Sequence, residues 1–261
     1  MSVVTATATY LYGAVQSVRD PLRAARTRAP RGLPGAGPPR ALSAGPRLWL
    51  IAATAPLDQY GAETIDARLA DLDWVSRCAL AHDAVVNHLA RQHPVIPMKL
   101  FTLFTSDERA VAHVTRTRRK LDRLFARIAG REEWGVRLLL DERRALASRA
   151  EPVAAASGTE FLRRKKVAKD ARQQIVADAL QEADRLFEAL TSAAEDSRRR
   201  TPAVEGPTSR MLLDAAFLVP RADARRFRAA ATAAVRPLVA RGLEISLTGP
   251  WPPYHFEADE S

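Results

Sequence analysis

Strand-like and helical patterns alternate along this chain in two successive series, and this alternation restricts the fold more than any other feature. The first series begins with apolar and β-branched residues 8–15 (ATYLYGAV) and continues with a second strand-like run at 47–54 (RLWLIAAT). A helical stripe then covers residues 71–92, and residues 95–104 (VIPMKLFTLF) form a further strand. The helical pattern of residues 105–130, opened by the capping box TSDE, completes a small sheet with its helices.

The second series repeats this order. Residues 132–141 (EEWGVRLLLD) have strand character, and the capping box SGTE opens a long helical pattern over residues 160–196. A strand at 210–220, a helix over 221–242 and an alternating strand at 242–250 follow. The economical architecture is of the α+β class, with two small sheets that each carry helices on one face.

We place the boundary between the two expected domains after residue 130, which gives domains of residues 1–130 and 131–261. An insertion rich in Arg, Pro and Gly at residues 23–47 interrupts the first domain. The long helix of residues 160–196 would extend ~55 Å if it is continuous. Because a small domain needs less than that to cover one sheet, part of this helix is expected to project or to pair with another helix.

The net charge of +10 leaves two interpretations open. A basic chain can bind nucleic acid, an anionic surface or an acidic partner, and a basic nucleic-acid-binding protein is therefore the alternative function. The charge can also reflect a general preference for arginine over lysine. The basic side of the helix at 105–130 is better explained as a solvated face, because neither stacking aromatic residues nor a nucleic-acid motif accompanies it. Its basic residues are Arg116, Arg119, Lys120, Arg123 and Arg127.

The side chains that usually carry catalysis or hold metals are few and scattered. His82 and His88 are six residues apart, so on a helix they do not form the i, i+4 pair of a zinc site. The single cysteine, Cys78, excludes an internal disulfide and lies in an apolar helical pattern, where a packed thiol is expected. Neither a glycine-rich phosphate loop nor a nucleophile elbow occurs. We therefore predict no enzyme, no cofactor and no metal, and a cytoplasmic protein without a signal or membrane span.

The chain ends on a stiff aromatic segment, residues 248–256, directly after the last strand. Taken alone, a proline-rich stretch of this kind could be a ligand for an aromatic groove. In its place after a strand, we interpret it as a structural clasp that folds back over an apolar face or over the junction between the two halves. The prolines lower the entropy cost of that return. The clasp residues are Pro250, Trp251, Pro252, Pro253, Tyr254 and Phe256.

Three stretches together resemble the gas vesicle protein family GvpF/GvpL. They are YLYGAV at residues 10–15, the block AHDAVVNHLARQHPVIPMKLFTLFTSDERAV at 81–111 and the terminal LTGPWPPYHF at 247–256. The supporting segments EEWGVRLLL, GTEFLRRKK and MLLDAAFLVPR lie between them in order, so the resemblance spans nearly the whole chain. Two departures are KLFT at residues 99–102, where many relatives carry a glycine, and the insertion at 23–47.

The resemblance implies a non-enzymatic accessory factor that assists nucleation or growth of the gas vesicle shell. It implies a ferredoxin-like N-terminal domain and a more helical C-terminal α+β domain with a long, coiled-coil-like helix. The implied partners are the hydrophobic major shell protein and other gas vesicle accessory proteins, with no membrane insertion. The protein is then expected in the cytoplasm, associated with gas vesicles.

A protein that shields apolar shell subunits could offer a sheet edge to an added strand, or a groove to an amphipathic helix. The long helix and the strand at 95–104 are the candidate surfaces, and internal packing is the alternative for both. RRKK near the start of the long helix opposes the helix dipole, which favours an acidic partner, although simple solvation explains it as well. The candidate partner-binding residues are Arg163, Arg164, Lys165, Lys166, Ile175, Leu186 and Phe187.

Overall fold

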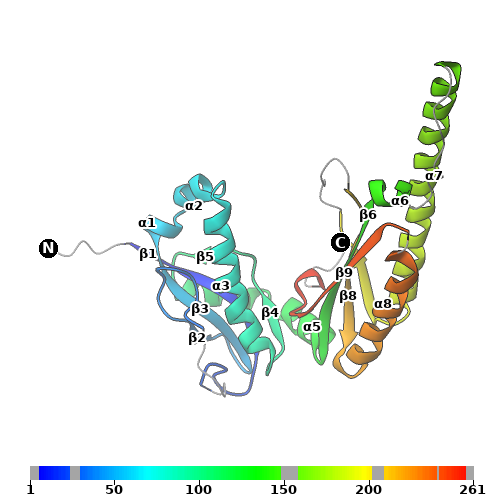
Figure 1. The fold of residues 1–261 in the computed structure, drawn as a ribbon. Coiled ribbons are helices and arrows are strands. Elements are labelled where there is room, and N and C mark those ends of the chain that lie inside the picture. Colours follow the sequence, from blue (N-terminus) through cyan, green and yellow to red (C-terminus); the bar gives the residue numbers. More distant parts are fainter. Residues whose placement is uncertain (1–5, 24–29, 148–157, 202–208, 240, 257–261) are drawn as a thin grey trace. The chain divides into compact units, whose positions relative to one another are not determined.

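The computed structural model describes the chain except residues 1–5, 24–29, 148–157, 202–208, 240 and 257–261. The chain forms two compact units (Figure 1). One comprises Met1–Gly130 together with Pro252–Ser261, and the other comprises Arg131–Trp251. The fold is of the predicted α+β class, with two antiparallel sheets.

The first unit is built around the strand β1 (Thr7–Gln16). The sheet order is β2-β3-β1-β4, all neighbouring strands are antiparallel, and the short strand β5 also pairs with β1. The other strands are β2 (Arg40–Ser43), β3 (Leu48–Pro56), β4 (Val95–Pro97) and β5 (Leu103–Phe104). The predicted strand at 95–104 is thus interrupted, because residues between β4 and β5 form a turn closed by the bond from Thr102 N to Lys99 O, 3.1 Å.

Both faces of this sheet are covered, whereas the sequence analysis expected helices on one face only. Side chains alternate between the faces of a strand, so Tyr10 and Tyr12 enter one core while Leu11 and Ala14 enter the other. The core that contains Tyr10 is covered by α3 (Leu72–Ala90), and α1 (Leu57–Tyr60) and α2 (Ala62–Arg68) also contribute to it. The opposite core is covered by α4 (Asp107–Arg116) and α5 (Arg118–Ile128).

The helical pattern of residues 105–130 is divided into these two helices at Thr117. The α4 helix begins one residue later than expected, because Ser106 rather than Thr105 is its N-cap and accepts a hydrogen bond from Arg109 N at 3.3 Å. The side-chain hydroxyl of Thr117 donates to Val114 O at 3.1 Å, which satisfies a carbonyl at the break.

Two buried tyrosine hydroxyls hold the proline- and glycine-rich segment against the first unit. The N–H of Leu33 donates to Tyr12 Oη at 2.9 Å, and Tyr60 Oη donates to Pro34 O at 2.6 Å. Leu33 itself is buried in the core with Tyr12 and Tyr60. This segment therefore packs as part of the unit and lies between β1 and β2, where the second unit has a helical crossover.

The second unit has the same strand order and the same strand directions as the first. Its order β7-β8-β6-β9 matches β2-β3-β1-β4 when the strands of each unit are counted along the chain. The strands are β6 (Arg131–Asp141), β7 (Asp196–Arg199), β8 (Ser209–Pro220) and β9 (Leu243–Trp251). With the helical crossover between β6 and β7, this unit carries the complete β-α-β-β-α-β succession of a ferredoxin-like fold.

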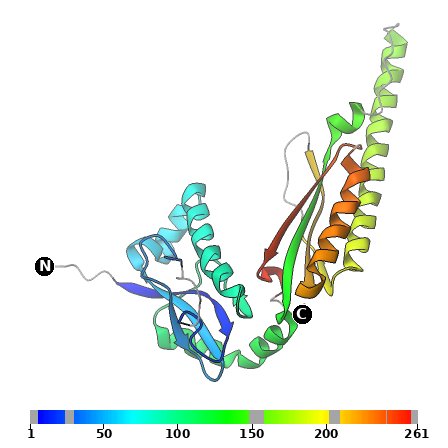
Figure 2. The ribbon, with the colours of Figure 1, turned by 60° about the horizontal axis from the view of Figure 1, so that its bottom comes forward.

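Two long helices cover one face of the second sheet (Figure 2). They are α7 (Gly158–Thr191) and α8 (Ala224–Val239), while the shorter α6 (Glu142–Ala147) follows β6 and the 3-10 turn Arg221–Asp223 precedes α8. The 34 residues of α7 extend ~51 Å, and the N-terminal part of the helix projects beyond the sheet (Figure 1). It ends at Thr191, before the predicted end at residue 196, and after a short turn Asp196–Arg199 form the edge strand β7.

A glycine occurs at matching places in the two central strands, and its surroundings give a test of the packing. A Cβ added at Gly13 would lie 2.8 Å from the backbone oxygen of Ile96 in β4, whereas one added at Gly135 would lie 2.6 Å from the hydroxyl of Thr248 in β9. Gly13→Ala should lower the free energy of unfolding by ~1–3 kcal/mol, because backbone atoms must move. The destabilisation caused by Gly135→Ala should be smaller in a protein that also carries Thr248→Ala, because that substitution removes the obstructing hydroxyl.

Urea denaturation of the two single variants and of the Gly135→Ala/Thr248→Ala double variant measures this difference. Thr248→Ala alone is the control for the loss of its own contacts. If the changes in the free energy of unfolding caused by Gly135→Ala and Thr248→Ala simply add, the Thr248 hydroxyl does not obstruct a side chain at residue 135.

Candidate functional site

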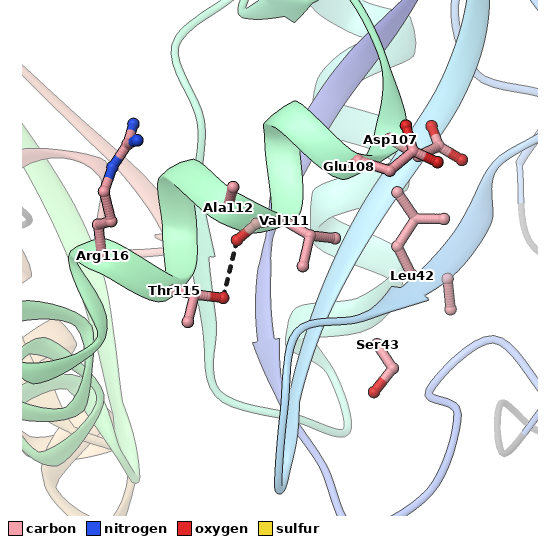
Figure 3. A pocket seen from close by; sticks show the side chains of 9 residues that line it. Leu42, Ser43, Asp107, Glu108, Val111, Ala112, Thr115 and Arg116 are labelled. Atoms are coloured by element: carbon pink, nitrogen blue, oxygen red, sulfur yellow. Dashed lines mark hydrogen bonds between the residues drawn. The ribbon is translucent and has the colours of Figure 1, made fainter.

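A groove runs along the outer edge of the first sheet, between β2 and α4 (Figure 3). Its volume is about 820 Å³. The strand supplies one wall and the helix supplies the other. The lining residues are Ala41, Leu42, Ser43, Asp107, Glu108, Val111, Ala112, Thr115 and Arg116.

The wall formed by β2 is a short edge strand bounded by turn-forming residues. Pro38 and Pro39 precede it, and a tight turn at Gly45 and Pro46 joins it to β3. The bond from Ala44 N to Leu48 O, 2.9 Å, sets the alternation of the antiparallel ladder. By this alternation, the backbone N–H and C=O groups of Ala41 and Ser43 point away from β3. Within the described residues β3 is the partner of β2, so these groups lie on the open edge.

Asp107 holds the helical wall in place. Its Oδ1 accepts a hydrogen bond from the Thr9 hydroxyl at 2.7 Å and another from Arg40 Nη2 at 2.5 Å. The first contact joins the start of α4 to the central strand β1, and the second joins it to β2. The spacing between helix and edge strand is therefore set by one carboxylate at the first turn of α4.

Opposite charges lie at the two ends of the groove, with an apolar surface between them (Figure 3). Glu108 is exposed, and the hydroxyl of Ser106 lowers the pKa of its carboxyl, so the group is ionised at neutral pH. Arg116 is exposed at the other end of the helix, and among the described residues no ion pair to it occurs. Leu42 and Val111 pack at the rim of the core beneath.

The groove is not among the candidate surfaces predicted from the sequence. The sequence pattern places Arg116 on the basic face of one helix, and residues 40–43 fall within the insertion rich in Arg, Pro and Gly. Four residues between prolines are too few for a period-two pattern to stand out. The turn signal at Gly45-Pro46 before the apolar run of β3 was the available indication of a hairpin.

The three apolar residues among those expected to bind a partner on α7 lie in or against the core of the second unit. Ile175 and Leu186 are buried there, so in this fold they are not on a surface that a partner can reach. Phe187 packs against the same core, and the Arg199 guanidinium lies 4.4 Å from its ring centroid. The side chains of Arg163, Arg164, Lys165 and Lys166 lie outside the part of the chain that the structure describes.

The residues expected in the terminal clasp are divided between the two units. Pro250 and Trp251 belong to β9, and Trp251 is 41% exposed. From Pro252 the chain belongs to the first unit, where Tyr254 packs against the core that contains Tyr10 and its hydroxyl donates to Asp83 Oδ1 at 2.5 Å. Pro252, Pro253 and Phe256 are buried. The sequence analysis placed this whole tail in the second domain, and the long-range contact with α3 is the reason for the difference.

His82, which precedes Asp83 in α3, is buried as a neutral base. Its Nδ1 lies 2.6 Å from the hydroxyl of Tyr10. Burial lowers the pKa of His82 to about 4, against an opposing effect of the neighbouring Asp83. Burial also raises the pKa of the Cys78 thiol. These groups are packed in the core, and the described residues contain no cluster of His, Cys, Asp or Glu that could hold a metal ion.

The sequence of this chain matches a known protein family. The family model described as "Gas vesicle synthesis protein GvpL/GvpF" matches residues 8–258. The chain belongs to the GvpL/GvpF family. It is also 33% identical over 237 residues to "Gas vesicle protein L" of Streptomyces sp. (strain CB03234), which covers 87% of this chain and 86% of that protein.

Two solved GvpF structures have the same fold as this GvpL/GvpF chain. The crystal structure of GvpF from Anabaena sp. PCC7120 superposes with a TM-score of 0.71 at 17% identity and covers 98% of each chain. GvpF from Microcystis aeruginosa gives a TM-score of 0.66 at 15% identity, covering 96% of this chain and 99% of that one. In the described part of the chain, no helix is both long enough and apolar enough to cross a membrane.

The contacts of the tail predict unequal effects for its aromatic residues. Phe256→Ala should lower the free energy of unfolding by ~3–5 kcal/mol, because a fully buried ring is lost. Trp251→Ala should cost no more than about half as much, since its ring is 41% exposed. Tyr254→Phe, which keeps the ring and removes the bond to Asp83, should cost ~1–2 kcal/mol. Urea denaturation of the full chain checks this order, and a larger loss for Trp251→Ala than for Phe256→Ala would contradict it.

The buried His82 predicts a dependence of stability on pH. Its folded pKa, about 4, is below the ordinary value of 6.5, so between these values the unfolded chain binds a proton that the folded chain does not. The free energy of unfolding should therefore fall as the pH decreases from 6.5 towards 4, with up to ~3 kcal/mol arising from this side chain. His82→Asn removes this titration and retains a polar group beside Tyr10.

The measurement is urea denaturation of both proteins between pH 7 and pH 4.5. The stability difference between wild type and His82→Asn should narrow as the pH falls, whereas acid effects at His88 and His93 act on both proteins alike. If the stability difference between the two proteins stays constant over this range, His82 is not the source of the pH dependence.

Proposed function

We propose that this chain is an accessory factor that assists nucleation or growth of the gas vesicle shell, without being an enzyme. The observation that carries the proposal is the match of the GvpL/GvpF family model to residues 8–258, nearly the full length of the chain. The relative at 33% identity, named a gas vesicle protein, supports it over a similar span. We place the protein with the gas vesicles during their assembly.

The proposed partners are the hydrophobic major shell protein and other gas vesicle accessory proteins. An assembly factor has to hold such subunits before they join the shell, which requires a binding surface with an apolar part. The groove between β2 and α4 has an apolar floor and charged ends, and it supports this mode of action. Nucleic acid is not among the proposed partners, because the basic face of α5 has no stacking aromatic residues in its sequence.

For the terminal segment, we propose a structural role as a clasp. The buried Phe256 and the bond between Tyr254 and Asp83 support it, because both stabilise the return of the chain to the first unit. Pro252 and Pro253 restrict the backbone of the segment before it docks, which lowers the entropy cost of ordering it.

Deleting the gene in a gas-vesicle-forming host, or from a reconstituted gas vesicle gene cluster, tests the proposed function. Cells should then contain few or no gas vesicles by electron microscopy, and the full chain supplied from a plasmid should restore them. The tagged full chain should also co-purify with the major shell protein from cells that are assembling vesicles. Vesicles in normal number without the gene would exclude an essential assembly role.

A further inference from the structure

We propose that the groove between β2 and α4 binds an extended segment of a partner protein as an added β-strand. The segment carries an acidic, an apolar and a basic residue at alternate positions, so its pattern is [Asp/Glu]-x-apolar-x-[Lys/Arg]. The choice of a gas vesicle component as the partner rests on the proposed function. The pattern itself follows from the edge strand, the apolar floor and the two charged ends of the groove.

The open edge of β2 supplies the backbone contacts. The N–H and C=O groups of Ala41 and Ser43 point outward, which is the arrangement that an added strand pairs with. Ser43 is exposed, and side chains of β2 and α4 line the groove from its two sides (Figure 3). An incoming strand can therefore extend the sheet while lying against the helix.

The apolar floor defines the middle position of the segment. Leu42 faces the helix side of the sheet and packs with Val111 at the rim of the core. Alternate side chains of an added strand point to that same side, where they would meet Val111 and Ala112. A small or β-branched apolar side chain at the middle position fits this surface between strand and helix.

The spacing of the two charges sets the outer positions. Glu108 and Arg116 are separated by eight residues of α4, which corresponds to ~12 Å along the helix axis. An extended strand covers ~13 Å in four residues. Residues i and i+4 of the segment therefore reach the two charges, and they lie on the same face as the apolar residue i+2.

The direction of β2 sets the order of the charges in the segment. Arg40, at the start of β2, bonds Asp107 at the start of α4, and beyond the other end Arg118 Nη2 donates to Pro46 O at 3.1 Å. The strand and the helix therefore run in the same direction. An added strand that pairs antiparallel, as throughout this sheet, first passes Arg116 and last passes Glu108. The acidic residue consequently precedes the basic one.

A second copy of this chain fits the groove less well than such a segment. If two β2 strands paired antiparallel, the groove of one copy would receive Arg40 of the other at the position beside Arg116. Two guanidinium groups would then meet where the groove requires an acid, so the charges favour a different protein as the occupant.

The test uses the full chain and two labelled peptides. The matched peptide is Thr-Glu-Thr-Val-Thr-Arg-Thr, and its charge-reversed control is Thr-Arg-Thr-Val-Thr-Glu-Thr. Fluorescence anisotropy should show the matched peptide binding about tenfold more tightly, as two exposed ion pairs are exchanged for like-charge contacts. Amide NMR shifts should move at Ala41, Ser43 and Val111. The proposal would be overturned if both peptides bound with equal affinity, or if neither peptide bound.

Substitutions on β2 and on α4 separate the backbone contribution to binding from the charge contribution. Ser43→Pro removes an outward N–H from an edge strand, where proline is tolerated, and should abolish binding while the melting temperature changes little. Arg116→Glu should weaken binding of the matched peptide, and Arg116→Glu/Glu108→Arg should reverse the preference between the two peptides. Arg123→Glu, an exposed change of the same charge on α5, is the matched control and should have no effect. The double variant keeps the test decisive if Ser43→Pro fails to fold.

Cell experiments distinguish failure of the groove from failure of the proposed function. If the chain carrying Arg116→Glu/Glu108→Arg restores vesicles fully in the deletion host, the groove is not the partner site, even though the assembly role stands. If the peptides behave as expected but deletion leaves vesicles intact, the groove stands and the assembly role fails. Concentration-dependent dimers that Ser43→Pro abolishes, without peptide binding, would assign the edge to a second copy instead.

Discussion

The first unit depends on the burial of both faces of β1. Alternate side chains of this strand enter two separate cores, so each face needs its own cover: α3 on one side, α4 and α5 on the other. The same strand also holds the proline-rich segment through Tyr12 and the start of α4 through Thr9. One central strand thereby positions the helix that stands beside β2, and the edge groove is a consequence of covering the second face.

The two units share one strand order but differ in which faces of the sheet their helices cover. The second unit uses helices α7 and α8 to cover one face, and its first crossover is long enough to project. In the first unit the described residues between β1 and β2 form no helix, and α4 and α5 cover the opposite face. Because the added helices stand beside a four-residue edge strand, the groove arises in the first unit from an addition to the shared plan.

Much of this fold could be predicted from sequence because its signals are local. The strands around Tyr12 and Phe217, the helix around Cys78 and the family resemblance all follow from short patterns. The groove and the tail could not be predicted in this way. The pairing of Asp107 with Arg40 and of Tyr254 with Asp83 joins residues 67 and 171 positions apart, and periodicity contains no information about such partners. The apolar stripe of α7 marked the buried face of the helix, but periodicity alone could not decide whether that face meets the core or a partner.

The return of the chain to the first unit has a consequence for its synthesis. Residues Arg131–Trp251 form a unit of their own, yet they are inserted within the sequence of the first unit, whose last described residues are Pro252–Phe256. A chain made from its N-terminus has therefore produced the whole second unit before the first receives Tyr254 and Phe256. Synthesis of the N-terminal unit therefore begins first, yet this unit can be complete only after the entire intervening chain has been made.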